Sequence, residues 1–519
     1  MKALLLRPVN TAEGNKKFES ENALKYRRTG ESLALGYLSA VLEKDGHDVS
    51  VIDGNLQNLS NNEIIKAINN GNYDIIGFSA NVYSDLNNDL DIISRIDTKI
   101  NPFVCIGGHV ATFMDEYILR KSTRVKCVIR YEGEVPWCLL VKALSNGDEW
   151  HSIPNLSYIQ NNTIHRTDSY KLDDNYLDVL PHPRRDMIKY LDPRCSLINV
   201  CTSRGCYGNC SFCSVRSFYC ERGAKWRGRS PENVVAEIEE IYHQYGFDNY
   251  LFVDDNYVGP GQYGVDRIER IAKLLLDKQL KIYYATNFRA NDVVRCKGIL
   301  PLLKQSGLSY VFLGTESGCT SQLDFFNKQI SVETNREAVN LLDGLGIGVT
   351  QGLILFDYRI TVDELKNNLS YVKSTEGINA GKLYSKLLIY HGTTLYEKTK
   401  QERGLAEKCA PIELEFENAD VAKIYSIVSK TMSWGAELYN LIEDLYWDCA
   451  FRYHIVFPPE LKILNNKINF RLIEYMQNVI DCVISSKQTE TIDTEIISFI
   501  LSETQNAKVF AKQFKERYT

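Results

Sequence analysis

The chain has 519 residues, 44% of them hydrophobic and 24% charged, a composition typical of a globular protein with two or three domains. Its formal net charge of −6 provides no basic excess for a nucleic-acid backbone, so no nucleic-acid partner is expected. No apolar run approaches the roughly 18 residues that span a bilayer, and residues 1–8 are too short for a signal peptide. The 14 cysteines, with one tight group in mid-chain, therefore favour reduced thiols, a metal site and a cytoplasmic location.

Residues 1–146 alternate short apolar runs with helical patterns. After the first run, apolar residues from Leu33 to Leu42 repeat at helical spacing, and Gly46 ends that helix. Because strands that alternate with helices form parallel sheets covered on both faces, we expect an α/β, Rossmann-like, doubly wound domain. Its strands are predicted at residues 3–6, 49–53, 75–79, 103–106 and 127–130.

Residues 147–194 lose this alternation and are interpreted as a linker. Pro181 and Pro183 lie in a run that can form neither a regular strand ladder nor the interior of a helix.

A second alternating series covers residues 195–399. One of its helices has a clear start, with Ser230 as N-cap and Pro231 at the first helical position. Six strand–helix units in succession predict a partial (β/α)6 barrel, whose sites gather at the C-terminal strand ends. The strands are predicted at residues 197–202, 250–253, 282–285, 310–313, 352–355 and 383–389. Residues 400–519 are predicted to form a mainly helical C-terminal domain.

The tight cysteine group follows the first strand of this second series. Cys206, Cys210 and Cys213 have a C-x3-C-x2-C spacing, and small or polar residues between them let the backbone fold around a metal cluster. Three thiolates on a four-iron cluster leave one iron without a protein ligand. Such an open position distinguishes a catalytic metal site from a closed structural one.

A closed site is the main alternative. Cys201 or Cys220 is near enough in the sequence to act as a fourth ligand. The chain would then hold zinc, or a closed cluster that makes it a non-catalytic electron carrier or redox sensor. A chance grouping of cysteines is the remaining possibility.

Further segments stand at predicted strand ends, at residues 226–235, 252–256, 289–291, 314–317 and 390–393. Together with the cysteine loop they resemble the radical S-adenosylmethionine (radical SAM) enzymes, in particular their cobalamin-associated branch. The resemblance implies a [4Fe–4S] cluster that cleaves SAM reductively. It also implies that Phe212 packs near the adenine and that Arg289 and Glu316 contact the methionyl or ribose part. The alternative for the last two is a structural ion pair at the barrel mouth.

The first domain has its own ordered set of segments, at residues 32–38, 74–79, 106–109 and 131–134. They resemble the cobalamin (B12)-binding domain of the same enzymes, and they fall near strand ends, where doubly wound sheets bind ligands. The alternative is a domain that has lost cobalamin and helps to hold substrate. The resemblance implies that cobalamin is bound by Ser79, Gly107, Gly108, His109, Glu132 and Gly133.

One partial match fails. Asp45-Gly46-His47 begins like the D-x-H-x-x-G motif that supplies an axial histidine to cobalt in other B12 proteins, but Ser50 stands in place of its glycine. We therefore expect His47 to be a turn residue that does not bind cobalt.

The resemblances imply an enzyme that uses SAM and cobalamin to methylate an unactivated carbon. A rearrangement, cyclisation or oxidation without methyl transfer remains the alternative within the same family. A small molecule or a peptide is the expected substrate, and a flavodoxin- or ferredoxin-type protein is the expected electron donor.

Overall fold

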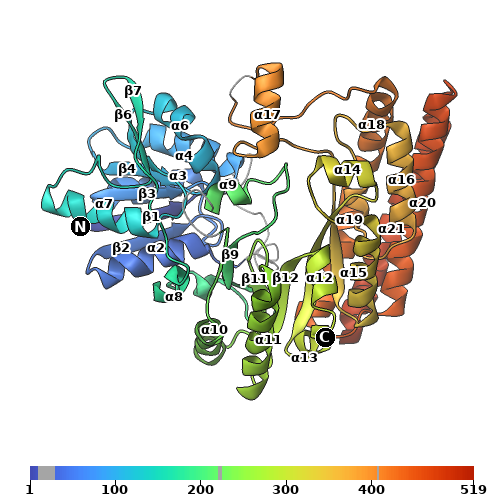
Figure 1. Cartoon of the computed structure of the whole chain (residues 1–519), viewed down its shortest axis with the longest axis horizontal. Helices are drawn as coiled ribbons and strands as arrows, with labels where there is room; N and C mark the ends of the chain where they lie inside the picture. Colours follow the sequence, from blue (N-terminus) through green and yellow to red (C-terminus); the bar gives the residue numbers. More distant parts are fainter. Residues whose placement is uncertain (10–29, 220–224, 406–407, 519) are drawn as a thin grey trace.

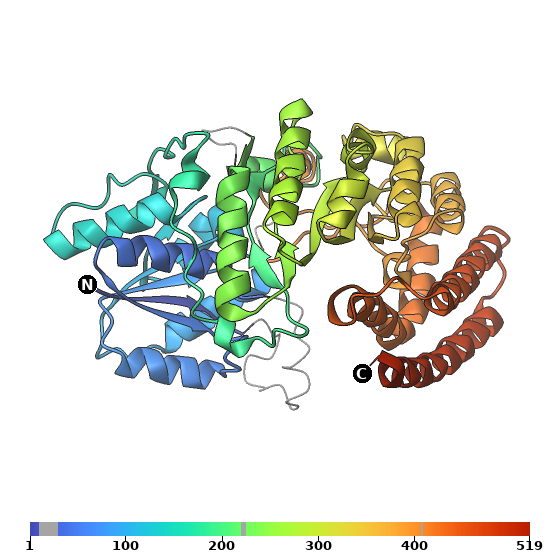
Figure 2. The same cartoon turned by 90° about the horizontal axis from the view of Figure 1, so that it is seen from below.

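The computed structural model describes residues 1–9, 30–219, 225–405 and 408–518. Its elements form an N-terminal α/β unit, a central α/β unit and a C-terminal group of helices, which lie side by side (Figures 1 and 2). Within these residues, no helix is both long and apolar enough to cross a membrane.

The N-terminal sheet has seven strands in the order β2-β1-β3-β4-β5-β6-β7. Successive strand residues pack on opposite faces: Leu4 and Leu6 contact one set of helices, and Ala3 and Leu5 contact the other. The doubly wound, Rossmann-like prediction is therefore confirmed. The strands are β1 (Lys2–Arg7), β2 (Asp48–Asp53), β3 (Ile75–Ser79), β4 (Phe103–Gly107), β5 (Val125–Ile129), β6 (Leu156–Gln160) and β7 (Thr163–Arg166). On one face lie α2 (Leu33–Lys44) and α7 (Glu134–Asn146), and on the other α3 (Asn61–Asn70), α4 (Tyr83–Arg95), α5 (His109–Phe113) and α6 (Asp115–Lys121).

The predicted linker is wrong for residues 156–166. There the chain forms the hairpin β6–β7, which adds two antiparallel strands to the edge of an otherwise parallel sheet. Arg166 of β7 donates two hydrogen bonds to Asp115 of α6, so a charge pair as well as the ladder holds the hairpin. Sequence patterning missed it because only one face of so short a hairpin is apolar. The rest of the segment is irregular apart from α8 (Tyr176–Val179) and the 3-10 turn η1 (Ile188–Tyr190).

The central sheet has five parallel strands in the order β14-β13-β12-β11-β8. They are β8 (Ile198–Val200), β11 (Asn249–Phe252), β12 (Tyr283–Arg289), β13 (Leu308–Glu316) and β14 (Gly348–Leu353). Beside it lies a short antiparallel pair, β9 (Ser203–Gly205) and β10 (Trp226–Gly228). The helix α9 (Val215–Tyr219) comes between these two strands in the sequence. The remaining helices of this unit are α10 (Pro231–Tyr245), α11 (Gly261–Asp277), α12 (Ala290–Arg295), α13 (Leu300–Gln305), α14 (Thr320–Phe325), α15 (Val332–Gly344) and α16 (Val362–Lys373).

The sixth predicted strand, at residues 383–389, is reduced to two isolated bridges after the 3-10 turn η2 (Ala380–Lys382): a parallel one between Phe356 and Lys386 and an antiparallel one between Ile389 and Ile412. Its apolar residues are buried without a ladder. Leu383 packs in one core, and Leu387 and Ile389 pack in another, so the segment passes between two layers instead of extending the sheet. The barrel is accordingly partial.

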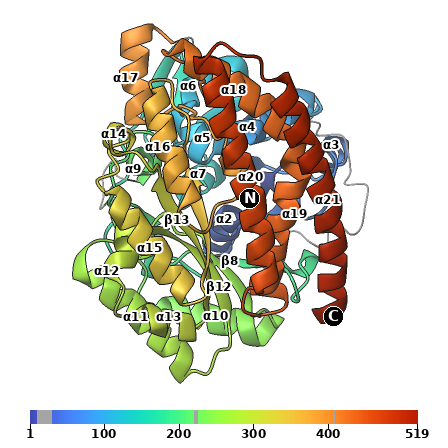
Figure 3. The same cartoon turned by 90° about the vertical axis from the view of Figure 1, so that its right-hand side faces the viewer.

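The C-terminal region is helical, as predicted, although the expected boundary at residue 399 falls inside α17 (Figure 3). The end of α19 and the π-helical turn after it lie against one face of the central sheet, where Trp447 stacks on Tyr310 at 5.2 Å between ring centroids. This packing covers the N-terminal half of the strands and leaves their C-terminal ends facing the first unit. The helices are α17 (Thr394–Arg403), α18 (Ala419–Met432), α19 (Ala436–Trp447), α20 (Pro459–Ile484) and α21 (Glu490–Tyr518), with the 3-10 turn η3 (Ser433–Gly435) and the π-helical turn η4 (Asp448–Arg452) between them.

Candidate active site

The cysteine loop, residues 206–213, connects β9 to α9 and is held mainly through its backbone. The amide of Ser211 donates to the carbonyl of Phe326 at 2.8 Å, and the Ser211 carbonyl accepts from the Leu395 amide at 2.9 Å. Asn327 Nδ2 donates to the Asn209 carbonyl at 2.7 Å. The loop is therefore fixed through its backbone by the residues that follow α14 and by the first turn of α17, and Ser211 Oγ adds a hydrogen bond to the Phe325 carbonyl at 3.0 Å.

The three thiols are half-buried and lie close enough to affect one another. Burial first, and then the neighbouring Cys210 and Cys206, raise the pKa of Cys213 to about 12. Burial also raises the pKa of Cys206, although the Gly208 amide, 3.3 Å from its sulfur, opposes the shift. Both shifts favour the protonated thiol, so binding a cluster must displace the protons of Cys206 and Cys213.

Among the described residues, no three His, Cys, Asp or Glu side chains converge closely enough to hold one metal ion together. A tetrahedral zinc site requires such convergence, whereas each thiolate of a four-iron cluster binds a different iron. Cys201 is engaged elsewhere, because its sulfur donates to the Ser203 carbonyl and packs with Tyr37 and Leu177. Cys220 lies outside the described residues. The loop thus suits a cluster with three protein ligands.

The residues predicted to contact SAM lie around this loop. Phe212 packs edge-on against Phe326, with ring centroids 5.3 Å apart. Arg289 ends β12, and its Nη1 donates to the sulfur of Cys210 at 3.4 Å. Glu316 ends β13 with φ +62, and Lys328 Nζ donates to its Oε1 at 2.7 Å. Arg289 and Glu316 therefore do not pair with each other; Lys328, which no sequence motif indicated, pairs with Glu316.

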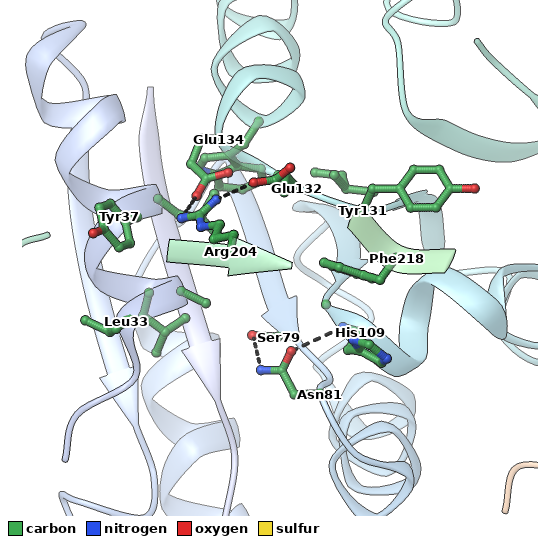
Figure 4. A pocket seen from close by; sticks show the side chains of 18 of the residues that line it. Leu33, Tyr37, Ser79, Asn81, His109, Tyr131, Glu132, Glu134, Arg204 and Phe218 are labelled. Carbon is green, nitrogen blue, oxygen red and sulfur yellow. Dashed lines mark hydrogen bonds and ion pairs between the residues drawn. The ribbon is translucent and has the colours of Figure 1, made fainter. Parts of the chain in front are cut away.

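A cavity of about 1160 Å³, part of it open to solvent, lies where the C-terminal edge of the N-terminal sheet faces the central unit (Figure 4). Its N-terminal side includes the whole set predicted to bind cobalamin: Ser79, Gly107, Gly108, His109, Glu132 and Gly133. Parallel topology brings these residues together because it places the carboxyl ends of β3, β4 and β5 at one edge. Figure 4 shows the hydrogen bonds of Asn81 with Ser79 and His109 at this edge.

The cavity floor has space that depends on glycine. A Cβ at Gly77 would lie 3.0 Å from the ring of Trp137 and 3.1 Å from Leu5. A Cβ at Gly108, where φ is +109, would lie 2.6 Å from the Ala80 carbonyl oxygen. Among the described residues, Trp137 Nε1 finds no hydrogen-bond partner although it is buried. An apolar floor, a polar rim and close backbone approach fit a large ligand with an apolar base and amide groups, such as cobalamin.

The upper rim is a buried ion-pair network between the two units (Figure 4). Arg204, which lies in β9 two residues before Cys206, donates to Glu132 at 2.8 Å and to Glu134 at 2.7 Å. Arg227 also binds Glu132. Burial would raise the pKa of Glu134, but the charges of Arg204 and Arg227 hold it below its usual value. Sequence reasoning missed Arg204 because it belongs to no motif and acts on another domain.

His109 joins the cavity to the cysteine loop. Its Nε2 lies 2.7 Å from the hydroxyl of Ser214, the residue that follows Cys213, and its ring stacks on Phe218 at 4.7 Å. Burial lowers the pKa of His109 to about 4, so the imidazole is neutral at pH 7. His47, in contrast, lies in the turn before β2, as expected.

Asp255 is a further residue that the sequence did not single out. It lines the cavity from the central unit, and its Oδ2 accepts from the Gly205 amide at 3.1 Å. Enclosure by the cavity walls raises the pKa of its carboxyl to about 6. The segment around it was a motif, but only the folded chain shows that this side chain faces the cavity.

Comparison with known proteins agrees with this arrangement. The B12 binding domain family matches residues 22–141, and the radical SAM superfamily matches residues 200–372. An uncharacterized methyltransferase of Pyrococcus horikoshii is 30% identical over 388 residues, which cover 73% of this chain and 81% of that protein. The hopanoid C-3 methylase of Methylococcus capsulatus is 29% identical over 334 residues, which cover 62% of this chain and 61% of that protein.

A solved structure shares the fold. It is the cobalamin-dependent SAM radical enzyme OxsB with aqua-cobalamin and SAM bound, with a TM-score of 0.75 and 18% identity over 99% of this chain and 79% of that chain. The chain therefore belongs to the radical SAM enzymes with a B12-binding domain, and its cofactors are a [4Fe–4S] cluster, SAM and cobalamin.

Proposed function

We propose that this enzyme methylates a carbon atom of a small-molecule or peptide substrate, with cobalamin as methyl carrier and SAM at a three-cysteine cluster. The observation that carries the proposal is the single cavity at the domain junction. One wall comes from the glycine-containing strand ends of the first domain and the other from the residues that flank the cysteine loop. The two relatives named as a methyltransferase and a methylase support it.

In this proposal the cluster is ligated by Cys206, Cys210 and Cys213. SAM binds beside them, with its adenine near Phe212 and its methionyl or ribose part near Arg289 and Glu316. Cobalamin occupies the cavity and contacts Ser79, Gly107, Gly108, His109, Glu132 and Gly133.

The bound cofactors supply one-electron cleavage of SAM and a methyl group carried on cobalt. The chain's own residues hold both cofactors at one junction and keep water out of it. Arg204 fixes the separation of the two units, because its ion pairs with Glu132 and Glu134 tie the strand before the cysteine loop to the cobalamin side. His109 hydrogen-bonds Ser214 as a neutral ring and so adds no charge beside Cys213.

The same proposal includes a partner and a compartment. The cluster requires an electron, which we assign to a flavodoxin- or ferredoxin-type donor. The net charge of −6 offers no basis for a nucleic-acid partner. The 14 cysteines, with one tight group in mid-chain, support a reducing compartment, which we assign as the cytoplasm.

The first experiment measures cobalamin and cluster content of the full chain, purified and reconstituted without oxygen, by visible spectroscopy and mass spectrometry. Near-stoichiometric cobalamin beside a [4Fe–4S] signal is the expected result. A cluster without cobalamin, even when cobalamin is supplied, would rule out methyl transfer. It would leave a radical enzyme that rearranges, cyclises or oxidises its substrate.

A second measurement separates an enzyme from an electron carrier. The reconstituted chain is incubated with a strong reductant and SAM that carries an isotopically labelled methyl group. We expect 5′-deoxyadenosine to form, and the label to appear on cobalamin. Cluster reduction without 5′-deoxyadenosine would favour the closed, non-catalytic cluster.

A further inference from the structure

Arg289 reaches the cysteine loop from the end of β12. Its side chain is buried, and Nη1 donates to the sulfur of Cys210 at 3.4 Å. Nη2 donates to the Lys328 carbonyl at 2.7 Å, and Nε is 3.4 Å from Asn291 Oδ1. The guanidinium is therefore held from three directions, with one edge against a predicted cluster ligand.

The loop itself is shaped around this guanidinium. The ring of Tyr207 lies 5.5 Å from the Arg289 Cζ, within cation–π range. The Tyr207 hydroxyl is fixed in turn by Asp292, to which it donates at 2.5 Å. Asn256 Nδ2 donates to the other carboxylate oxygen of Asp292 at 2.7 Å. A second layer of hydrogen bonds thus keeps the aromatic ring in place over the cation.

Gly208 provides the space on the other side. A Cβ at this position would overlap Arg289 Nη1 and would lie 3.0 Å from Arg289 Cζ and 3.4 Å from the Cys206 sulfur. The φ of Gly208 is not in the left-handed region, so backbone conformation does not require glycine here. The physical reason for glycine at position 208 is therefore the space that the Arg289 guanidinium occupies.

We infer that Arg289 is a positioning residue of the cluster: its guanidinium fixes the Cys210 sulfur and raises the reduction potential of the cluster. The inference rests on the proposed function, in which the three cysteines ligate a [4Fe–4S] cluster. It reassigns Arg289 from SAM to the cluster, because its directed donors point to the Cys210 sulfur and to a backbone carbonyl.

The sign of the effect follows from charge. One-electron reduction of the cluster adds one negative charge to it, and a fixed buried cation stabilises the more negative state. Loss of that cation must shift the midpoint potential to more negative values. Lysine keeps the charge but cannot reproduce the directed donor pair of the guanidinium, so its effect is smaller.

The experiment is a redox titration of the full chain, reconstituted without oxygen and without SAM, with the reduced cluster followed by electron paramagnetic resonance. The variants are R289Q, R289K and G208A. The matched control is R336Q, because Arg336 also lies over a tyrosine ring, 5.0 Å from that of Tyr371, but donates to Ser374 and touches none of the groups around Arg289.

We expect R289Q and G208A to shift the midpoint to more negative potential, R289K to shift it less, and R336Q to match the wild type. If R289Q assembles no cluster, R289K and G208A provide the comparison. The inference would be overturned if R289K, G208A and any cluster formed in R289Q had the midpoint potential of the wild type. Weakened SAM binding by these variants in a separate titration would then return Arg289 to SAM. A wild-type chain that assembles no [4Fe–4S] cluster would instead overturn the proposed function itself.

Discussion

The cysteine loop keeps its path through backbone hydrogen bonds to Phe326 and Leu395, so one sulfur can be exchanged without moving the others. We expect Cys213→Ser to lose most of the cluster iron and the cleavage of SAM, because a hydroxyl is a far poorer iron ligand than a thiolate. Iron and sulfide analysis after anaerobic reconstitution, together with 5′-deoxyadenosine formation, measures both effects.

Cys201→Ser is the matched control. The Cys201 sulfur donates to the Ser203 carbonyl in a different part of the core, so this variant should keep the iron content of the wild type. Equal iron loss in both variants would contradict the three-cysteine assignment and favour a closed, four-cysteine cluster.

Gly108 illustrates how one missing side chain shapes the cobalamin side. Its φ is +109, and a Cβ would lie 2.6 Å from the Ala80 carbonyl oxygen. We expect Gly108→Ala to lower the free energy of unfolding by about 1–3 kcal/mol. It should also weaken cobalamin binding several-fold, because Ala80 and its neighbours must shift. Urea unfolding and an equilibrium cobalamin titration measure the two effects.

Gly147 provides the comparison, since it also has positive φ, +74, but a Cβ added there would meet no atom within 4 Å. Gly147→Ala should lower the free energy of unfolding by about 1 kcal/mol and leave cobalamin binding unchanged. Similar cobalamin affinities for the two variants would show that the close approach at Gly108 does not shape the cavity.

Among the elements, α10 was predictable because its signals are local. Ser230 caps it by accepting from the Asn233 amide, Pro231 occupies the first turn, and Gly246 ends it in the left-handed conformation. The role of α19 was not predictable. Its aromatic stripe fits an ordinary core helix equally well, and only tertiary packing shows that it covers the inner face of the central sheet.

Trp447, at the end of α19, tests that packing. It is 7% exposed and stacks on Tyr310, with Phe312 at 5.6 Å. We expect Trp447→Ala to lower the free energy of unfolding by about 3–5 kcal/mol, as for other buried aromatic residues. Trp434, which is 58% exposed, should tolerate the same change within about 0.5 kcal/mol. Urea unfolding followed by circular dichroism compares the two, and equal losses would contradict the arrangement.

The docking of the domains creates the site, and two histidines, the half-buried His109 and the buried His391, lie at their junction. His109 contacts Ser214, and His391 Nδ1 lies 2.7 Å from the hydroxyl of Tyr83. Burial lowers the pKa of both imidazoles from 6.5 to about 4. Because the unfolded chain binds these protons at higher pH than the folded chain, stability is lost as pH falls from 6.5 toward 4.

We expect the free energy of unfolding, measured in urea at a series of pH values, to decrease through this window. The double variant H109Q/H391Q should show a much flatter dependence there. A slope equal to that of the wild type would mean that other groups titrate at the junction.

The positions of the residues that we propose to bind cofactors were largely predictable, for a physical reason. The three cysteines lie within eight residues, and their spacing alone indicates a cluster. Ser79, Gly107 and Glu132 are far apart in sequence, but each lies at or just beyond a predicted strand end, and parallel strands bring such ends to one edge. Their chemical roles stay predictions until a cofactor is bound.

The sequence determined the class of fold, the cysteine loop and the edge of the first sheet at which we propose that cobalamin binds, since these depend on local spacing and strand periodicity. Tertiary structure decided the pairing of Arg204 with Glu132, 72 residues apart, and of His391 with Tyr83, 308 residues apart. It also reduced the sixth barrel strand to two isolated bridges and added a hairpin to the first sheet. Such contacts form when whole domains and layers pack against one another. The burial of apolar surface stabilises that packing, but it leaves no periodic signal in the sequence of either segment.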